Sequence, residues 1–197
     1  MHGSATIRLA TAEDARYILE IYAPFCRDTF ITFETEPPTL EEMKARIEGK
    51  GSFYPWLVCE GPEVLGYAYA TQHRQRAAYQ WAADVSVYLA DGHRGRGLGR
   101  ALYTSLLALL KLQGFLRVCA GIALPNPASV GLHEALGFRP VGIFPSIGYK
   151  LGRWHDVGWW QLMLDHADSD PPPPVSVKRI APRHLSDALA AGEALLQ

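Results

Sequence analysis

The stretch His93-Arg94-Gly95-Arg96-Gly97-Leu98-Gly99-Arg100 decides the fold, because it places three glycines at alternate positions between two periodic segments. Apolar residues alternate over residues 81–89 and predict a strand, while leucines recur at helical spacing over residues 98–110 and predict a helix. Glycine opens backbone conformations that other residues avoid and lets a ligand approach the main chain. The first N–H groups of a helix have no partner within it, and the helix dipole favours negative charge there. The stretch therefore predicts a main-chain cradle for a phosphate, with three arginines beside it.

Two common phosphate-binding loops do not fit these glycines. The Walker pattern ends in Gly-Lys-Ser/Thr, whereas this chain has Gly99-Arg100-Ala101, and the dinucleotide pattern GxGxxG needs a wider second spacing. The pattern that remains is Arg94-x-x-Gly97-x-Gly99. Repeats of glycine and arginine also occur in disordered or RNA-binding tracts, but such tracts lack aliphatic flanks of this kind.

The composition limits the class of protein. The chain has 197 residues, 48% of them hydrophobic, which suits one domain with some excess. The net charge of −1 lacks the basic surplus of a nucleic-acid-binding protein. No apolar run is long enough to span a bilayer, and the first residues lack a signal-peptide pattern.

The cysteines and histidines indicate the compartment. Cys26, Cys59 and Cys119 are odd in number and far apart, which is typical of free thiols in a reducing compartment. The seven histidines show no metal-ligand spacing with one another or with the cysteines. We therefore expect a soluble cytoplasmic protein that binds no metal, no nucleic acid and no membrane.

The hydrophobic pattern predicts an α/β fold with a mixed central sheet flanked by helices. Capping boxes at Thr11 and Thr39 begin two helices, and Asn126 followed by Pro127 begins another. We expect one domain over residues 5–166, followed by a proline-rich spacer and tail over residues 167–197 that could hold a short helix. The other expected elements are a strand at 7–9, an end to the second helix at Gly49 and Gly51, strands at 54–60, 64–71, 81–89 and 116–124, a helix end at Gly137, and strands at 139–144 and 158–164 with an aromatic loop between them.

Several segments resemble one enzyme family. The pattern Arg94-x-x-Gly97-x-Gly99 resembles the loop with which GNAT acetyltransferases hold the pyrophosphate of acetyl-coenzyme A. Within that superfamily, residues 54–58, 124–129 and 133–138 resemble the phosphinothricin N-acetyltransferase subfamily. Residues 148–162, GYKLGRWHDVGWWQL, are its most specific signature. The similarity runs from about Ile7 to Leu164 and implies the GNAT fold, acetyl-CoA as co-substrate, a small-molecule amine as acceptor and a homodimer.

The resemblance also assigns a cofactor site. The main chain of residues 87–89 would pair with the pantetheine arm, and residues 95–100 would hold the pyrophosphate. Asn126 would lie near the arm, although its alternative role is that of a plain helix N-cap. The predicted cofactor-binding residues are Val87, Tyr88, Leu89, Arg94, Gly95, Arg96, Gly97, Leu98, Gly99, Arg100 and Asn126.

The position of the base departs from the family pattern. The subfamily has Glu as Trp-x-x-Glu in the strand before the loop, whereas this chain has Trp81-Ala82-Ala83-Asp84. Asp84 falls on the polar face of the strand and could take the proton of the amine, directly or through one water. The alternative is a solvated or hydrogen-bonded strand aspartate, one methylene shorter. His133 is the second candidate base, and its alternative is a surface or satisfied core histidine.

An amino-acid-like acceptor carries a carboxylate, so cations should meet it. Arg76 and Tyr79 match the substrate segment of the family, Lys150 is a further cation, and Phe33 and Trp81 could wall the pocket. Each cation is alternatively a solvated charge, and each aromatic is alternatively part of the core. We read the adjacent pair His155-Asp156 as structural, because neighbouring strand residues point to opposite faces.

These observations predict an acetyl-CoA-dependent N-acetyltransferase that works by direct attack of the amine, without an acyl-enzyme. The resemblance implies a substrate of the phosphinothricin, methionine sulfoximine or methionine sulfone type. One alternative is the acetylation of another amine, such as a polyamine or a protein N-terminus. The other is a non-catalytic acyl-CoA-binding regulatory module, which the departure at Asp84 motivates.

Overall fold

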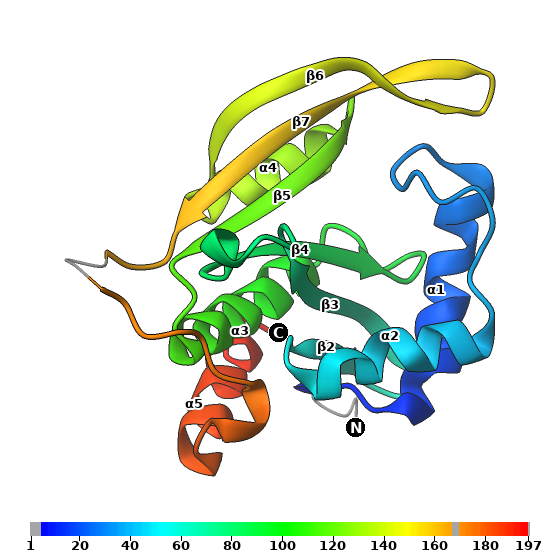
Figure 1. The fold of residues 1–197 in the computed structure, drawn as a ribbon. Helices are drawn as coiled ribbons and strands as arrows, with labels where there is room; N and C mark the ends of the chain where they lie inside the picture. The colour runs from blue at the N-terminus through cyan, green and yellow to red at the C-terminus, as the bar shows by residue number, and fades with distance from the viewer. Residues whose placement is uncertain (1–4, 167–169, 197) are drawn as a thin grey trace.

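The central feature of the protein is a mixed seven-stranded sheet with the strand order β1-β2-β3-β4-β5-β7-β6 (Figure 1). The computed structural model describes residues 5–166 and 170–196. The prediction of an α/β fold with a mixed central sheet flanked by helices is confirmed. The elements are β1 (Thr6–Leu9), η1 (Ala12–Asp14), α1 (Ala15–Asp28), α2 (Leu40–Ser52), β2 (Trp56–Glu60), β3 (Val64–Gln72), η2 (Ala77–Tyr79), β4 (Ala82–Leu89), α3 (Leu98–Gln113), β5 (Arg117–Leu124), α4 (Pro127–Ala135), β6 (Arg139–Lys150), β7 (Arg153–Met163), η3 (Val177–Arg179) and α5 (Pro182–Glu193).

The sheet is divided where β4 meets β5. This pair is parallel, whereas the other neighbouring strands run antiparallel. The β4–β5 ladder covers only Ala82–Asp84 against Arg117–Cys119. Beyond that point β4 continues beside β3 while β5 follows β7, so the two strands diverge (Figure 1). The divergence leaves the main chain of Val85–Leu89 unpaired on its β5 side, with Asp84 at the apex.

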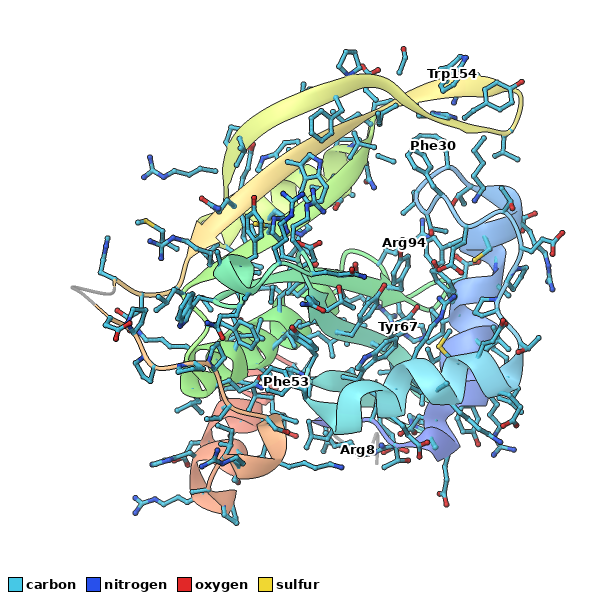
Figure 2. The ribbon with its side chains drawn as sticks, in the orientation of Figure 1. Arg8, Phe30, Phe53, Tyr67, Arg94 and Trp154 are labelled. Atoms are coloured by element: carbon cyan, nitrogen blue, oxygen red, sulfur yellow. The ribbon has the colours of Figure 1, made fainter. Side chains whose placement is uncertain are left out.

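Two hydrophobic clusters cover the two faces of the sheet. Side chains alternate along a strand, and β2 shows this directly: Leu57 packs in the cluster around α3, whereas Val58 packs in the cluster of α1 and α2. Tyr67 of β3 lies at the centre of the second cluster (Figure 2) and is 1% exposed. The helix α3 ends at Gly114, whose φ of 92° is the left-handed conformation that glycine supplies at a helix end.

Two predicted boundaries are wrong. The helix α2 runs past Gly49 to Ser52, because Gly49 keeps a helical backbone instead of the left-handed conformation of a cap. Glycine in an exposed helix costs only about 1 kcal/mol. The expected aromatic loop after residue 144 is part of a long hairpin formed by β6 and β7. Its strands escaped prediction because β6 is exposed along almost its whole length and carries two register shifts, so the alternation of a half-buried strand is missing.

The C-terminal tail contains the helix α5, which packs against α3. A Cβ at Gly192 would lie 2.2 Å from the Ala101 carbonyl oxygen, so the two helices touch closely there. The Ile7 N–H also donates to Glu193 Oε1 at 2.7 Å. The predicted boundary between domain and tail falls at residues 167–169, which lie outside the described residues. Among the helices that the structure describes, we find none that is long and apolar enough to cross a membrane.

Candidate active site

The glycine turn before α3 has the backbone of an anion cradle. Gly95 and Gly97 have φ angles of 75° and 81°, in the left-handed region that other residues avoid. The first α-helical hydrogen bond runs from the Ala101 N–H to the Gly97 carbonyl at 2.9 Å. The preceding N–H groups of α3 therefore have no acceptor within the helix and remain free for an anion. Gly99 has a different task, because a Cβ there would come within 3.2 Å of Leu132 on α4.

The three arginines of the turn are exposed. Arg94 lies between the end of β4 and α1 in Figure 2, with its guanidinium 5.3 Å from the centre of the Phe25 ring. Arg96 and Arg100 extend from the turn and the first turn of α3. All three are placed to add positive charge around the free N–H groups.

A groove follows the gap between β4 and β5, beyond Asp84, where the two strands diverge. It contains a small cavity of about 50 Å³ lined by β4 from Val85 to Tyr88, by β5 from Ala120 to Ala123 and by α4. Of the predicted cofactor-binding strand residues, Val87 and Tyr88 line this cavity. Leu89 lies beyond it, at the end of β4. The Tyr88 ring packs among Tyr22, Phe25 and Tyr67, so the main chain is the part of Tyr88 that is left for a ligand.

The groove reaches the start of α4, where Asn126 and His133 lie. The Asn126 side chain accepts a hydrogen bond from the Ser129 N–H at 3.2 Å, so it is the helix N-cap that the sequence left open. It also lines the groove, and its contact with a cofactor stays a prediction.

Both ring nitrogens of His133 have partners within the fold, which fits the alternative of a satisfied core histidine, and its role as a base stays a prediction. Its Nδ1 lies 2.7 Å from the Ser129 carbonyl oxygen and its Nε2 lies 3.1 Å from the Tyr103 hydroxyl. The ring is 3% exposed, and burial lowers the pKa of His133. Both nitrogens are therefore engaged, and no lone pair faces the groove.

Asp84 stands at the apex of the gap and is half-buried. Oδ1 of Asp84 lies 2.6 Å from Nδ1 of His73. Burial raises the pKa of Asp84, while the hydrogen bond to His73 and the positive charge of Arg74 act in the opposite direction. A carboxylate whose pKa burial raises, placed at the end of a groove, has the environment of a functional acid or base.

The sequence analysis missed His73, which lies between the strands expected at residues 64–71 and 81–89. Thr71 pairs with Asp84 across β3 and β4. A residue two positions further on lies on the same face and diagonal to the partner, so this register brings His73 to Asp84. The ring lies edge-on to Tyr79 at 5.8 Å and to Trp159 at 6.1 Å, measured between ring centres.

Cys119 completes the cluster around Asp84. The ligand atoms of His73, Asp84 and Cys119 lie within 4.8 Å of one another, a proximity that their spacing in the sequence did not reveal. The 2.6 Å separation of Nδ1 and Oδ1 is that of a shared proton; two ligands of a tetrahedral zinc ion at about 2.0–2.1 Å would stand farther apart. Burial raises the pKa of the Cys119 thiol, which disfavours the thiolate that a nucleophile or a metal ligand requires.

The predicted substrate residues separate into two groups. Arg76 and Tyr79 are exposed at η2, beside the Asp84–His73 pair, and Arg76 makes no ion pair with any residue in the described ranges. Phe33 is 39% exposed in the loop after α1, and its ring lies against the main chain of Gly148 on β6. These three remain available to a ligand.

Lys150 and Trp81 both make structural contacts, and their contact with a substrate stays a prediction. The Lys150 ammonium is buried and donates to the carbonyl oxygens of Thr32 and Glu34 at 2.7 Å each, and to that of Phe25 at 3.3 Å. Its three protons are all used to hold α1 and the loop after it. The Trp81 indole N–H donates to the Pro172 carbonyl at 2.9 Å and so faces the proline-rich spacer.

One buried donor near the apex lacks a partner. The Trp159 indole N–H makes no hydrogen bond with the residues that the structure describes. Its ring packs on Gly121, which lines the groove, and the Arg74 guanidinium lies 5.7 Å from the ring centre. Buried donors are normally satisfied, so this N–H fits a ligand that brings an acceptor. The glycine turn, the unpaired edge of β4 and this donor together suit a long ligand with an anionic end and a carbonyl end.

The sequence and the fold have clear relatives. Residues 7–159 match the family described as "Acetyltransferase (GNAT) domain". The chain is 44% identical to a phosphinothricin N-acetyltransferase of Streptomyces viridochromogenes over 86% of this chain and 92% of the relative. It is 37% identical to an L-methionine sulfoximine/L-methionine sulfone acetyltransferase of Pseudomonas paraeruginosa, over 85% of this chain and 99% of that relative. The crystal structure of a GNAT superfamily phosphinothricin acetyltransferase from Sinorhizobium meliloti in complex with AcCoA has a TM-score of 0.82 and 37% identity, covering 87% of this chain and 95% of that one.

Proposed function

Because the chain belongs to the GNAT family of acetyltransferases and is an N-acetyltransferase, we propose that it transfers the acetyl group of acetyl-CoA to the amine of a small amino-acid-like substrate. The relatives named for phosphinothricin and for methionine sulfoximine and sulfone support this substrate class. The observation that carries the proposal is the groove between β4 and β5, whose β4 wall, Val85–Tyr88, lies along the chain between the half-buried carboxylate of Asp84 and the glycine turn.

Each part of the groove has a binding task in this proposal. The free N–H groups at the start of α3 and the arginines of the turn bind the pyrophosphate. The main chain of Val87, Tyr88 and Leu89, unpaired on its β5 side, hydrogen-bonds the pantetheine arm. The co-substrate supplies an acetyl group activated as a thioester, and the Trp159 N–H is placed to donate to an acceptor near the apex.

The proton of the substrate amine is removed at the apex of the β4–β5 gap, where Asp84 lies. The amine of an amino acid arrives protonated and must lose a proton before it attacks. Asp84 is the carboxylate at the apex, and its raised pKa makes it a better proton acceptor than an ordinary aspartate. Holding the two reactants in line supplies much of the remaining rate, so no covalent enzyme intermediate is needed.

The carboxylate of the substrate requires a cation outside the groove. Arg76 is exposed beside the Asp84–His73 pair, in the segment that also presents Tyr79. We assign the carboxylate to Arg76, with the Tyr79 hydroxyl as a second donor, and place Phe33 on the opposite wall.

We propose that the protein forms a homodimer through the β6–β7 hairpin. The β6–β7 hairpin exposes apolar side chains along its length, and Trp154 lies far out on it, near Phe30 (Figure 2). A contiguous apolar patch of this kind marks an interaction surface, and a second copy is the proposed occupant. Free cysteines at 26, 59 and 119 agree with a cytoplasmic location. The exposed apolar residues of the hairpin are Val141, Ile143, Phe144, Ile147, Tyr149, Leu151 and Trp154.

A panel of amines tests the proposal. Release of free thiol from acetyl-CoA would be followed with phosphinothricin, methionine sulfoximine, methionine sulfone, a polyamine and a peptide with a free N-terminus. We expect kcat/KM to be highest for the amino-acid-like compounds. Preference for the polyamine or the peptide would contradict the substrate class. Binding of acetyl-CoA without turnover of any amine would support a regulatory module instead.

A further inference from the structure

The Asp84 carboxylate does not face the groove alone, because an imidazole is hydrogen-bonded to it. Nδ1 of His73 and Oδ1 of Asp84 are 2.6 Å apart, the short distance of a charge-assisted hydrogen bond. The two side chains are mostly shielded, at 16% and 26% exposure. A carboxylate that accepts a hydrogen bond from Nδ1 fixes the tautomer of the ring, so that the lone pair resides on Nε2.

The environment of His73 holds this ring in one orientation. Tyr79 and Trp159 meet it edge-on, with interplanar angles of 69° and 83°. Nε2 makes no hydrogen bond with any residue in the described parts of the chain, in contrast to His133, whose two nitrogens are both engaged. His73 is therefore the imidazole near the apex whose lone pair is free.

Resting on the function proposed above, we propose that His73 is the catalytic base, accepting the proton of the substrate amine at Nε2, and that Asp84 is its positioning residue. The arrangement is that of the carboxylate–imidazole pair of a catalytic triad, in which the carboxylate orients the ring and stabilises the imidazolium. This arrangement also accounts for the aspartate at position 84, where the subfamily has glutamate. The shorter side chain places its carboxylate at hydrogen-bond distance from the His73 imidazole.

The proton balance is complete with the groups at hand. Nε2 of His73 takes one proton from the substrate ammonium, and the freed nitrogen lone pair attacks the carbonyl carbon of the thioester. The new C–N bond forms as the C–S bond breaks, and the second amine proton passes to the departing thiolate. The imidazolium, paired with the Asp84 carboxylate, then returns its proton to solvent. One proton is released for each acetyl group transferred.

The charges around the pair set its response to pH. Burial raises the pKa of Asp84, while the hydrogen bond to His73 and the positive charge of Arg74 lower it. Burial raises the pKa values of Cys119 and Tyr54, and the negative charge of Asp84 acts in the same direction. The titratable and charged groups that face His73 or its partner are Asp84 on β4, Cys119 on β5, Tyr79 on η2, Arg74 and Tyr54.

The test separates the two residues. His73→Asn keeps an N–H that can donate to Asp84 but removes Nε2, so kcat should fall by about 10²–10⁴-fold, the usual worth of a general base. The affinity for acetyl-CoA should stay unchanged. The rise of kcat/KM with pH in the wild type should disappear. In His73→Ala, added imidazoles should restore turnover, and faster for the more basic ones. His184→Asn, an exposed histidine on α5, is the matched control and should behave as the wild type.

The outcomes are distinct. If His73→Asn keeps more than half of kcat and the pH profile while Asp84→Asn is inactive, the carboxylate acts alone and the inference is overturned. If His73→Asn does not fold, as judged by its thermal melt, His73→Gln and the imidazole rescue of His73→Ala decide in its place. Failure of the function proposed above would look different, because the wild type would then acetylate no amine of the panel.

Discussion

Gly97→Ala tests the phosphate cradle with a calculable cost. A Cβ at Gly97 would meet only the Leu195 carbonyl oxygen at 3.9 Å, so the added methyl group has room. The cost is therefore the backbone strain at a φ of 81°, which is about 1–2 kcal/mol for an L-residue with a side chain. In the free variant the turn can relax to a negative φ, and acetyl-CoA must then restore the strained conformation on binding.

This cost predicts a dissociation constant for acetyl-CoA that rises by about 5- to 30-fold, since 1.4 kcal/mol corresponds to tenfold. The melting temperature should fall by at most about 2–8 °C, at about 2–4 °C per kcal/mol for a chain of this size. Calorimetric titration measures the first and a thermal melt the second. Gly49→Ala is the control: Gly49 is helical and open, so the variant should gain stability and bind as the wild type does. Unchanged affinity in Gly97→Ala would remove the turn from the cofactor site.

Four further predictions concern the substrate, the loop, the base and the dimer. Arg76→Ala should raise KM for a carboxylate-bearing amine by about tenfold or more, because a charge-assisted hydrogen bond worth about 1.5–3 kcal/mol is lost. KM for the matching amide should barely change. Equal effects on both substrates would show that Arg76 does not bind the carboxylate. Lys150→Met should lower the free energy of unfolding, measured in urea, by about 2–6 kcal/mol, because the carbonyls of Thr32 and Glu34 each lose a donor and each loss costs about 1–3 kcal/mol. A loss of substrate affinity without a loss of stability would contradict the structural role. The folded-state pKa of Asp84 is raised, so the contribution of Asp84 to stability is present below its unfolded pKa and is lost as pH rises through its folded pKa. Asp84→Asn should therefore be more stable than the wild type at neutral pH and lose that advantage towards pH 3. A stability advantage independent of pH would contradict the burial of the charge. The double variant Val141→Lys, Trp154→Lys should be a monomer where the wild type is a dimer, because each substitution puts a charge into the apolar patch of the hairpin. Light scattering measures the mass of both proteins. An unchanged mass would place the interface elsewhere.

The sequence predicted the elements whose cause is local. The glycine turn, the leucines of α3 and the cap at Asn126 each depend on neighbouring residues, and the structure places all of them as expected. The β6–β7 hairpin could not be delimited, because its apolar side chains face outward and follow no period. Its inner strand, β7, is held by pairing with β5, a contact between distant segments.

The site could be predicted only in part, for the same reason. Asp84 was found because a strand pattern and a resemblance pointed to one residue. His73 was missed because its role depends on the register of β3 against β4. The burial of Lys150 could not be predicted because the three carbonyls that it holds come from α1 and the loop after it, more than 100 residues earlier in the chain. The presence of a lysine in the sequence does not distinguish a buried ammonium that holds carbonyl groups from one that binds a substrate.

The most direct test of the central claim is the turnover of Asp84→Asn with saturating acetyl-CoA and the best amine of the panel. The substitution keeps the shape of the side chain and removes its negative charge, whether Asp84 takes the proton itself or holds His73. We predict a kcat lower by about 10²–10⁴-fold, with an unchanged dissociation constant for acetyl-CoA and a pH dependence that is lost or moved upward. A kcat above half of the wild-type value would contradict the account, because the apex of the β4–β5 gap would then not be the place where the amine loses its proton.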